Sequence, residues 1–343
     1  MSGRRPREPL TARRVASVSL VLAGLLALAL VLGASFGAGR ASPLLFVPGG
    51  GGPSEVDRAV LLQVRLPRVV LAALLGGALT VAGTVFQALL RNPLADPYVL
   101  GVSGGASIGG VVALAFGLGR ALGGAAVPVL AFAGALGSLL LIRRVATVGG
   151  RLTVTTVLLT GAIFNAFSAA LIYFIQSVAS LAQLHAIVFY LMGRIPSYAP
   201  GQLALVGLVT AAVVAALVLM ARDYNALSLG EEGARQMGVD VERVKRRTFV
   251  LGSLLTAIAV SVAGLIGFVG LVVPHVLRTV LGPDHRLLLP AAFLGGAAFL
   301  VLADLVARVL VAPTELPVGV VTALVGGPFF LYLLRGRAGD DGR

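Results

Sequence analysis

The feature that most constrains this chain is a long apolar segment between two arginines. The 22 residues from Val69 to Leu90 lie between Arg68 and Arg91 and are almost all apolar. A helix rises about 1.5 Å per residue, so about 20 residues match the hydrocarbon core of a bilayer. The segment therefore predicts a membrane-spanning helix. Its small residues, Gly76, Gly77 and Gly83 among them, leave little bulk on one face and favour close approach of neighbouring helices.

The composition extends this prediction to the whole chain. Hydrophobic residues make up 58% and charged residues 12%, whereas soluble domains carry about 25% charged residues. We expect one transmembrane domain over residues 1–343 with no soluble module. The apolar run 15–32 follows five arginines, but further spans follow it, so we interpret it as a first span and not as a cleaved signal peptide. The absence of cysteine excludes disulfides and thiolate metal sites.

Apolar segments of spanning length recur from end to end and predict an all-α polytopic protein of about ten transmembrane helices. The run 248–282 would be about 50 Å long as one helix, too long for a bilayer, and Gly264, Gly267, Gly270 and Pro274 offer positions for a break. The apolar segment 186–192 is too short to span and predicts a re-entrant or interfacial helix. The expected spans are 15–36, 68–90, 98–118, 124–142, 153–175, 203–221, 248–268, 271–282, 287–308 and 317–334.

Basic residues predict the orientation. With ten crossings and the N-terminus inside, 20 of the 27 Lys and Arg residues fall on the inner side, as the positive-inside rule requires. The net charge of +13 is thereby explained without a nucleic-acid partner. Residues 1–14 and 335–343 become cytoplasmic tails, and 222–247 becomes a cytoplasmic loop. Seven arginines remain outside and need another explanation: Arg40, Arg58, Arg65, Arg68, Arg120, Arg194 and Arg308.

The sequence also suggests an internal repeat. Val81-Ala82-Gly83 recurs as Val262-Ala263-Gly264, and Pro93 recurs as Pro274, both at an offset of 181 residues. Five spans separate the copies, so the second copy is inserted upside down. An inverted repeat of spans 2–5 and 7–10 is an arrangement typical of transporters.

The loop 222–247 has the pattern of an amphipathic surface helix. Leu229, Met237 and Val241 recur at helical spacing among charged residues, and Gly230 and Gly238 divide the segment into short helices. Such a segment can lie on the headgroups as a connector. We favour a docking element for a cytoplasmic partner, because a helix that binds in a groove needs an apolar stripe with charged flanks.

Several kinds of chemistry are missing from the sequence. There is no Gly-x4-Gly-Lys-Ser/Thr motif, so an ATP-driven process would need a separate ATPase. The glycines between Gly101 and Gly110 lie in a span and predict close helix packing and not a phosphate loop. Asp304 and Arg308 predict an ion pair at a helix end. Three scattered histidines do not form a metal site, and with no paired nucleophile and base we expect no catalytic residues.

A set of short motifs is spread over the chain between about residues 60 and 335. They are Arg65-Leu-Pro-Arg68, Gly83-x3-Gln87, Asn92-Pro-Leu-Ala-Asp-Pro97, Leu100-Gly-Val-Ser-Gly104, Gly264-Leu-Ile-Gly-Phe-Val-Gly-Leu-Val-Val-Pro-His275, Asp284-His-Arg286, Ala303-Asp304 and Glu315-Leu-Pro-Val-Gly319. In these motifs and in their order the chain resembles the FecCD permeases, the membrane subunits of type II ATP-binding-cassette importers for ferric siderophores, haem and vitamin B12.

The resemblance implies a homodimer of ten-helix subunits, two cytoplasmic ATPase subunits that bind ATP and magnesium, and an extracytoplasmic binding protein. The chain itself would bind no cofactor and catalyse no reaction. It would lie in the cytoplasmic membrane of a bacterium or archaeon. An iron chelate is the first expectation for its cargo, haem the second and a corrinoid the third. The alternative from another class is a stand-alone secondary transporter, which the scarcity of acidic residues within the spans disfavours.

The resemblance also implies roles for individual residues. Arg65, Arg68 and Arg308 match arginines that bind acidic residues of the binding protein, and a guanidinium suits that task. An ordinary anchor at the membrane surface is the alternative explanation. The positions that match the ATPase-coupling helices are Leu229, Gly230, Glu231, Ala234, Met237, Gly238 and Val239. Asn92 and Leu94 match the inner mouth of the pathway, and Thr155 lies at the corresponding end of the fifth span. Asn165 either lines the pathway or bonds to a neighbouring helix.

Overall fold

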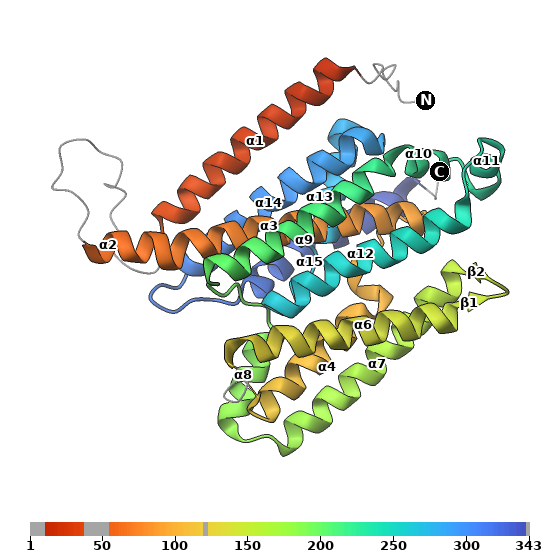
Figure 1. Cartoon of the computed structure of the whole chain (residues 1–343). Helices are drawn as coiled ribbons and strands as arrows, with labels where there is room; N and C mark the ends of the chain where they lie inside the picture. The colour runs from red at the N-terminus through yellow and green to blue at the C-terminus, as the bar shows by residue number, and fades with distance from the viewer. Residues whose placement is uncertain (1–10, 38–54, 119–122, 341–343) are drawn as a thin grey trace.

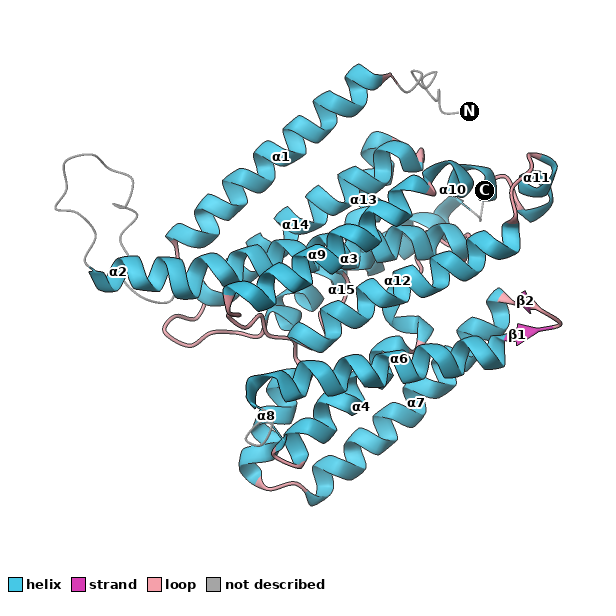
Figure 2. Ribbon diagram, in the orientation of Figure 1, coloured by secondary structure: helices cyan, strands magenta, loops and turns pink. Residues whose placement is uncertain are grey.

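Helices form nearly the whole structure (Figures 1 and 2). The computed structural model describes residues 11–37, 55–118 and 123–340. In the first half, the helices are α1 (Ala12–Ser35), α2 (Glu55–Ala59), a π-helical segment η2 (Val60–Arg65), α3 (Leu66–Leu89), a short 3-10 turn η3 (Pro97–Leu100), α4 (Val102–Ala115), η4 (Gly123–Ala125), α6 (Ala126–Ala146) and α7 (Val154–Val178). In the second half, they are α8 (Leu181–Leu191), α9 (Pro200–Leu219), α10 (Ala221–Leu227), α11 (Glu231–Gln236), α12 (Val241–Ala263), α13 (Val269–Leu281), α14 (His285–Val309) and α15 (Val318–Asp340).

Each of the ten predicted spans coincides with a helix, which confirms the all-α polytopic fold. Within the described residues, seven helices are long and apolar enough to cross a membrane, and α4, α13 and the apolar part of α15 are shorter. The predicted span 98–118 is only the 14-residue α4. Its start is delayed because Asp96 caps the turn η3 and Gly101 then adopts a φ of +86°. The short segment expected at 186–192 belongs to α8.

The helices form two groups (Figure 1). One group contains α4, α6, α7 and α8, and the other surrounds α3 with α9, α12, α13, α14 and α15. α12 joins the groups because it contacts α3 on one side and α4 and α6 on the other. α3 is the most deeply enclosed span, with 89% of its most apolar window buried, whereas α1 lies on the periphery with 6%.

The two halves repeat one pattern of helices. A long helix is followed by a short one and then by two long ones, as α3, α4, α6 and α7 and again as α12, α13, α14 and α15. α3 and α12 run in opposite directions through the molecule (Figure 1), as an inverted repeat requires. The offset of 181 residues does not pair equivalent positions, however. Gly83 lies inside α3 and Gly264 caps the end of α12, while Pro93 lies in a turn and Pro274 lies inside α13.

Small residues bring the central helices together, as predicted. A Cβ atom on Gly76 would overlap the carbonyl of Gly296 in α14, and one on Gly83 would overlap the carbonyl of Gly270 in α13. Gly105 of α4 stands in the same relation to Gly134 of α6, which confirms that this glycine-rich stretch serves helix packing.

The predicted break in 248–282 falls between α12 and α13. Gly264 ends α12 with a φ of +72°, and Phe268 precedes α13 with a φ of +67°. The Tyr98 hydroxyl, from the corresponding irregular segment of the first half, donates to the Ile266 carbonyl and accepts from the Ile266 amide, both at 3.0 Å. The two non-helical segments are therefore joined inside the bundle, where their backbone groups need protein partners.

The structure describes only part of the two predicted cytoplasmic tails. Residues 1–10 and 341–343 lie outside the described residues, as do the outer-loop residues Arg40 and Arg120. α1 begins directly after Thr11, whose hydroxyl caps the Arg14 amide at 3.2 Å. At the other end, α15 continues to Asp340 through most of the segment expected to be a tail.

Candidate docking and coupling sites

The three arginines predicted to dock a binding protein converge at one end of the bundle. Arg68 donates from Nε and Nη2 to Asp304 Oδ1 at 3.1 and 2.9 Å. Arg308 donates from Nε to the other carboxylate oxygen of Asp304 at 2.9 Å, which confirms the predicted helix-end ion pair. A second carboxylate, Glu315, accepts from Arg68 Nη1 at 2.7 Å. The cluster thus joins α3, α14 and the segment before α15.

Two of these arginines, Arg65 and Arg308, also cap the end of α1. Arg65 Nη1 donates to the Ser35 carbonyl at 3.0 Å, and Arg308 donates to the Gly33 and Phe36 carbonyls at 2.9 and 2.8 Å. The last carbonyls of a helix lack partners within the helix and carry partial negative charge, so cations are favourable there. The arginines therefore fix the otherwise peripheral α1 to the bundle.

Burial distinguishes these arginines from ordinary surface residues. Arg65, Arg68 and Arg308 are 7%, 8% and 3% exposed, and Asp304 is 1% exposed. Glu315 is the most accessible member of the cluster, with 31% of its side chain exposed. In this conformation the guanidinium groups are already engaged within the chain, and their docking role stays a prediction.

The predicted coupling segment lies at the opposite end of the bundle (Figure 1). It folds into α10 and α11, and Gly230 and Gly238 break the chain with φ values of +102° and +81°, as the sequence predicted. Leu229 and Met237 are 70% and 63% exposed, although both are large and apolar. Leu229 before α11 and Met237 after it are therefore accessible at the surface of the single chain.

The remaining positions of this segment hold α11 against the bundle. Ala234 is buried and Val239 is half-buried. Lys245 of α12 contacts Glu231 at 2.6 Å and Glu242 at 3.4 Å. Burial raises the pKa of Glu231, but the hydrogen bond and charge of Lys245 outweigh burial and lower it below its usual value. The carboxylate is thus charged at neutral pH and clamps α11 to α12.

A second contact joins α10 to the start of α14. The Asn225 amide donates to Asp284 Oδ1 at 2.7 Å and accepts from the His285 backbone amide at 2.8 Å. Arg286 binds the same carboxylate, with 2.6 Å between Nη2 and Oδ2, and its hydrogen bond lowers the pKa of Asp284. Asn225 belongs to none of the motifs in the sequence, and only the Asp284-His-Arg286 motif indicated this region.

Four residues were predicted to line the pathway or its gate. The Asn92 side chain accepts from the Leu94 amide at 3.0 Å, so both belong to one tight turn after α3. Thr155 lines a cavity of about 420 Å³ together with Glu231, and Arg91 lies on the same wall. Asn165 donates to the Tyr98 carbonyl at 2.9 Å, so it bonds to a neighbouring segment. The cavity places Thr155 beside the coupling segment, which the sequence did not indicate.

Another polar contact lies deeper in the bundle. Gln87 of α3 accepts from Arg278 Nη1 of α13 at 2.8 Å and donates to the Gly270 carbonyl at 3.3 Å. A buried glutamine can form both hydrogen bonds because its side chain carries a donor and an acceptor. The only signal for Gln87 in the sequence was its place in the Gly83-x3-Gln87 motif. Among the described residues, no group of three His, Cys, Asp or Glu side chains is placed to hold a metal ion.

Comparisons with known proteins agree with this architecture. The model of the FecCD transport family matches residues 20–336. The cobalamin import system permease protein BtuC of Halobacterium salinarum is 44% identical over 299 residues, 87% of this chain and 78% of that protein. The hemin transport system permease protein HmuU of Yersinia pestis is 41% identical over 277 residues, 80% of this chain and 83% of that protein.

A solved structure resembles the chain over nearly its whole length. It is described as an inward-facing conformation of a metal-chelate type ABC transporter, and it aligns with a TM-score of 0.82 and 31% identity over 94% of this chain and 99% of that one. Helix order, sequence and three-dimensional arrangement thus all indicate the same kind of membrane protein. The chain is an ABC transporter permease that crosses the membrane several times, and it belongs to the FecCD transport family.

Proposed function

We propose that this chain is the permease subunit of an ATP-driven importer that takes an iron chelate, a siderophore complex or haem, from an extracytoplasmic binding protein across the cytoplasmic membrane. Two copies form the pathway, and two separate ATPase subunits supply the energy. The chain forms no covalent intermediate. Both termini and the α10–α11 segment face the cytoplasm, as the distribution of basic residues predicts.

The observation that carries this proposal is the separation of two specialised ends on one bundle. The arginine cluster lies at one end and α10–α11 at the other, and α14 contributes to both. α14 has 25 residues, so it extends about 37 Å, enough to cross the bilayer. A helix that holds Asp284 near one partner and Asp304 near the other suits a protein that couples events on opposite membrane faces.

We propose that the binding protein docks at the accessible edge of the arginine cluster, where Arg68 contacts Glu315. Glu315 is the exposed carboxylate on Arg68, whereas Asp304 is buried between two arginines. A carboxylate of the binding protein can replace Glu315 on Arg68 Nη1 without leaving Asp304 unpaired. Arg65 and Arg308 then hold the surrounding backbone, and a guanidinium supports this exchange because it presents several donors in a fixed plane.

The pathway is proposed to follow α7. Thr155 and Asn165 both lie on this helix, about 15 Å apart along its axis at 1.5 Å per residue. Large apolar side chains on α7, including Ile163 and Phe167, are 62% and 59% exposed in the single chain. Such a face suits a second copy of the chain together with bulky cargo. Asn92 and Leu94 form the proposed inner gate.

The proposed cargo is a large chelate. Relatives named for hemin and for cobalamin import support a large chelate as the class of cargo. A corrinoid is the alternative within this class, and a stand-alone secondary transporter is the alternative outside it. Uptake experiments that include ferric siderophores, haem and cobalamin distinguish these cargoes.

The test is reconstituted transport. The full-length chain, its partner ATPase and its binding protein are placed in liposomes, and uptake of each cargo is measured with ATP, without ATP and under an ion gradient alone. We expect uptake only when ATP, ATPase and binding protein are all present. Uptake by the chain alone under the gradient would reject the importer assignment and support the secondary transporter.

A variant of the coupling segment sharpens this test. In Gly238→Val, a β-branched residue must adopt a φ of +81°, which costs about 1–2 kcal/mol and displaces the turn between α11 and α12. We expect ATP hydrolysis to continue while uptake falls about tenfold, which is the effect of about 1.4 kcal/mol added by the displaced turn to the barrier of the coupled step. Gly149→Val is the matched control, since Gly149 also has a positive φ and open space around it but lies in the turn of the β1–β2 hairpin. Coupled transport in Gly238→Val at the level of the control would contradict the proposed role.

A further inference from the structure

Two adjoining cavities at the α10–α11 end of the bundle are lined by five arginines. The larger, of about 790 Å³, contains Arg143, Arg243, Arg246 and Arg247, and Asp223 is its acidic residue. The smaller, of about 550 Å³, contains Arg143, Arg144 and Arg246. Because they share Arg143 and Arg246, we treat the two cavities as one site and call it the arginine groove. None of the proposed docking, coupling and pathway residues lines this groove.

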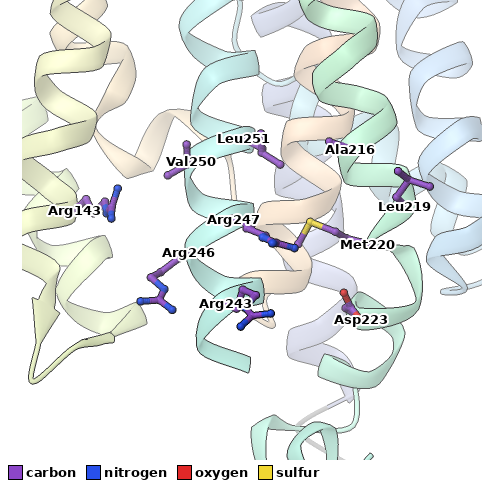
Figure 3. A pocket seen from close by; sticks show the side chains of 10 residues that line it. All are labelled: Arg143, Ala216, Leu219, Met220, Asp223, Arg243, Arg246, Arg247, Val250 and Leu251. Carbon is purple, nitrogen blue, oxygen red and sulfur yellow. The ribbon is translucent and has the colours of Figure 1, made fainter. Parts of the chain in front are cut away.

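The groove lies between helices and not on one helix alone. Arg143 is in the last turn of α6, and the other arginines of the larger cavity are in the first two turns of α12. Figure 3 shows Arg246 extending from α12 toward α6, where Arg143 lies, and Arg247 lying on the side of Met220 at the end of α9. Two spans, α6 and α12, therefore supply the guanidinium groups, and the end of α9 completes the lining.

The charge of the groove is largely uncompensated. Among the described residues, Arg243 forms an ion pair with the exposed Asp240 at 3.2 Å, and no carboxylate lies within ion-pair distance of Arg143, Arg144, Arg246 or Arg247. All five arginines are exposed in the single chain. Like charges that line one groove repel one another, so an anionic ligand that accepts hydrogen bonds from several of them is favoured.

Toward the bilayer centre, the wall of the groove becomes apolar. Val250 and Leu251 follow Arg246 and Arg247 by four residues and thus lie one helical turn deeper on the same face. Leu219 of α9 and Leu140 of α6, also in the lining, are 85% and 61% exposed. One turn is about 5.4 Å, the distance over which the edge of a bilayer changes from headgroups to acyl chains.

We propose that the arginine groove binds an anionic phospholipid of the cytoplasmic leaflet, specifically one with two phosphates, as in cardiolipin. One phosphate binds in each cavity, and Arg143 and Arg246 contact both. The acyl chains lie against the apolar wall formed by Leu140, Val250 and Leu251. A lipid satisfies both parts of the site, whereas a soluble protein would contact the arginines but leave the deeper apolar wall unfilled. Basic pockets between spans on this membrane side are typical cardiolipin sites.

The experiment measures lipid binding to the purified full-length chain by native mass spectrometry. Cardiolipin, phosphatidylglycerol and phosphatidylcholine are titrated separately. We expect cardiolipin to bind most tightly, phosphatidylglycerol less tightly and the zwitterionic lipid weakly. In Arg143→Gln/Arg246→Gln, the affinity for cardiolipin should fall about thirtyfold, because each arginine near an anionic headgroup contributes about fivefold.

Two variants control for charge and folding. Arg13→Gln/Arg335→Gln removes the same charge from exposed arginines outside both cavities and should bind cardiolipin normally. Arg143→Lys/Arg246→Lys keeps the charge and should retain most of the binding. Equal losses in the two glutamine variants, or equal affinities for cardiolipin and phosphatidylcholine, would overturn the proposal.

Two competitors distinguish other occupants. Excess inorganic phosphate should not displace cardiolipin, and complete displacement would show a simple anion site. The partner ATPase should bind without releasing the lipid. If ATPase binding instead releases it, and Arg143→Gln/Arg246→Gln weakens ATPase binding, the groove is a protein interface and the proposal is wrong.

Discussion

At the scale of single residues, Asp304 organises the end of the bundle that carries the arginine cluster. Its two carboxylate oxygens bind Arg68 and Arg308, and it is 1% exposed. An ion pair between exposed groups contributes about 0–1 kcal/mol. Removing one member of a buried pair costs more, because the remaining charge is left desolvated and unpaired.

Asp304→Asn should therefore lower the stability of the purified chain by about 3–5 kcal/mol. The expected readout is a lower midpoint of thermal unfolding in detergent. Glu315→Gln is the control, because Glu315 binds the same Arg68 but is partly exposed, so its loss should cost about 1 kcal/mol. Equal effects of the two substitutions would contradict the central place of Asp304.

At the scale of helices, close packing around α3 depends on glycine. Gly83 lies against the backbone of Gly270 in α13, and a side chain at Gly83 would overlap that carbonyl. Membrane helices gain little from the hydrophobic effect against each other, so such close contact between backbones is a main source of their attraction. Gly137 in α6 is also inside a helix but has open space where its Cβ atom would be.

Alanine should therefore have opposite effects at these two glycines. Gly83→Ala is expected to destabilise the chain by about 1–3 kcal/mol, because the added methyl group forces α3 and α13 apart. Gly137→Ala should be neutral or stabilising by up to about 1 kcal/mol, because alanine loses less entropy than glycine in a helix. Thermal unfolding of both variants in one detergent is the measurement, and a stabilised Gly83→Ala variant would be inconsistent with the packing.

At the scale of the whole molecule, the proposed function depends on two ends that face different compartments. α2, which continues through η2 into α3, begins at the end that carries the arginine cluster, and α11 lies at the other end (Figure 1). Since the chain has no cysteine, single cysteines report accessibility without background.

Labelling with a membrane-impermeant maleimide tests this arrangement. In Val56→Cys, a position 71% exposed on α2, we expect reaction only from the outside of intact cells. In Glu232→Cys, whose native side chain is 77% exposed on α11, we expect reaction only in inverted vesicles. Reaction of both positions from the same side would invalidate the orientation and with it the importer proposal.

The ten spans and the main breaks between helices could be predicted because they depend on local properties, whereas several helix ends, such as the start of α4 at Val102 and the end of α15 at Asp340, differ from the predicted limits. The length of the apolar segments predicted all ten spans. Gly230, Gly238 and Gly264 predicted breaks between helices, and each adopts a positive φ that glycine permits. Two predictions from short local signals were wrong. Pro274 was one of the positions offered for a break, but it lies inside α13 and does not end it, and the repeated offset of 181 residues relates positions that are not equivalent.

By itself, then, the sequence determined an inverted pair of helical halves and the family to which the chain belongs. Only the tertiary structure decided which buried polar groups meet: Arg68 with Asp304, 236 residues apart, and Asn225 with the start of α14. The physical reason is that apolar length and backbone propensity act within a segment. The partner of a buried charge, in contrast, is set by how closely distant helices pack, which no single segment encodes.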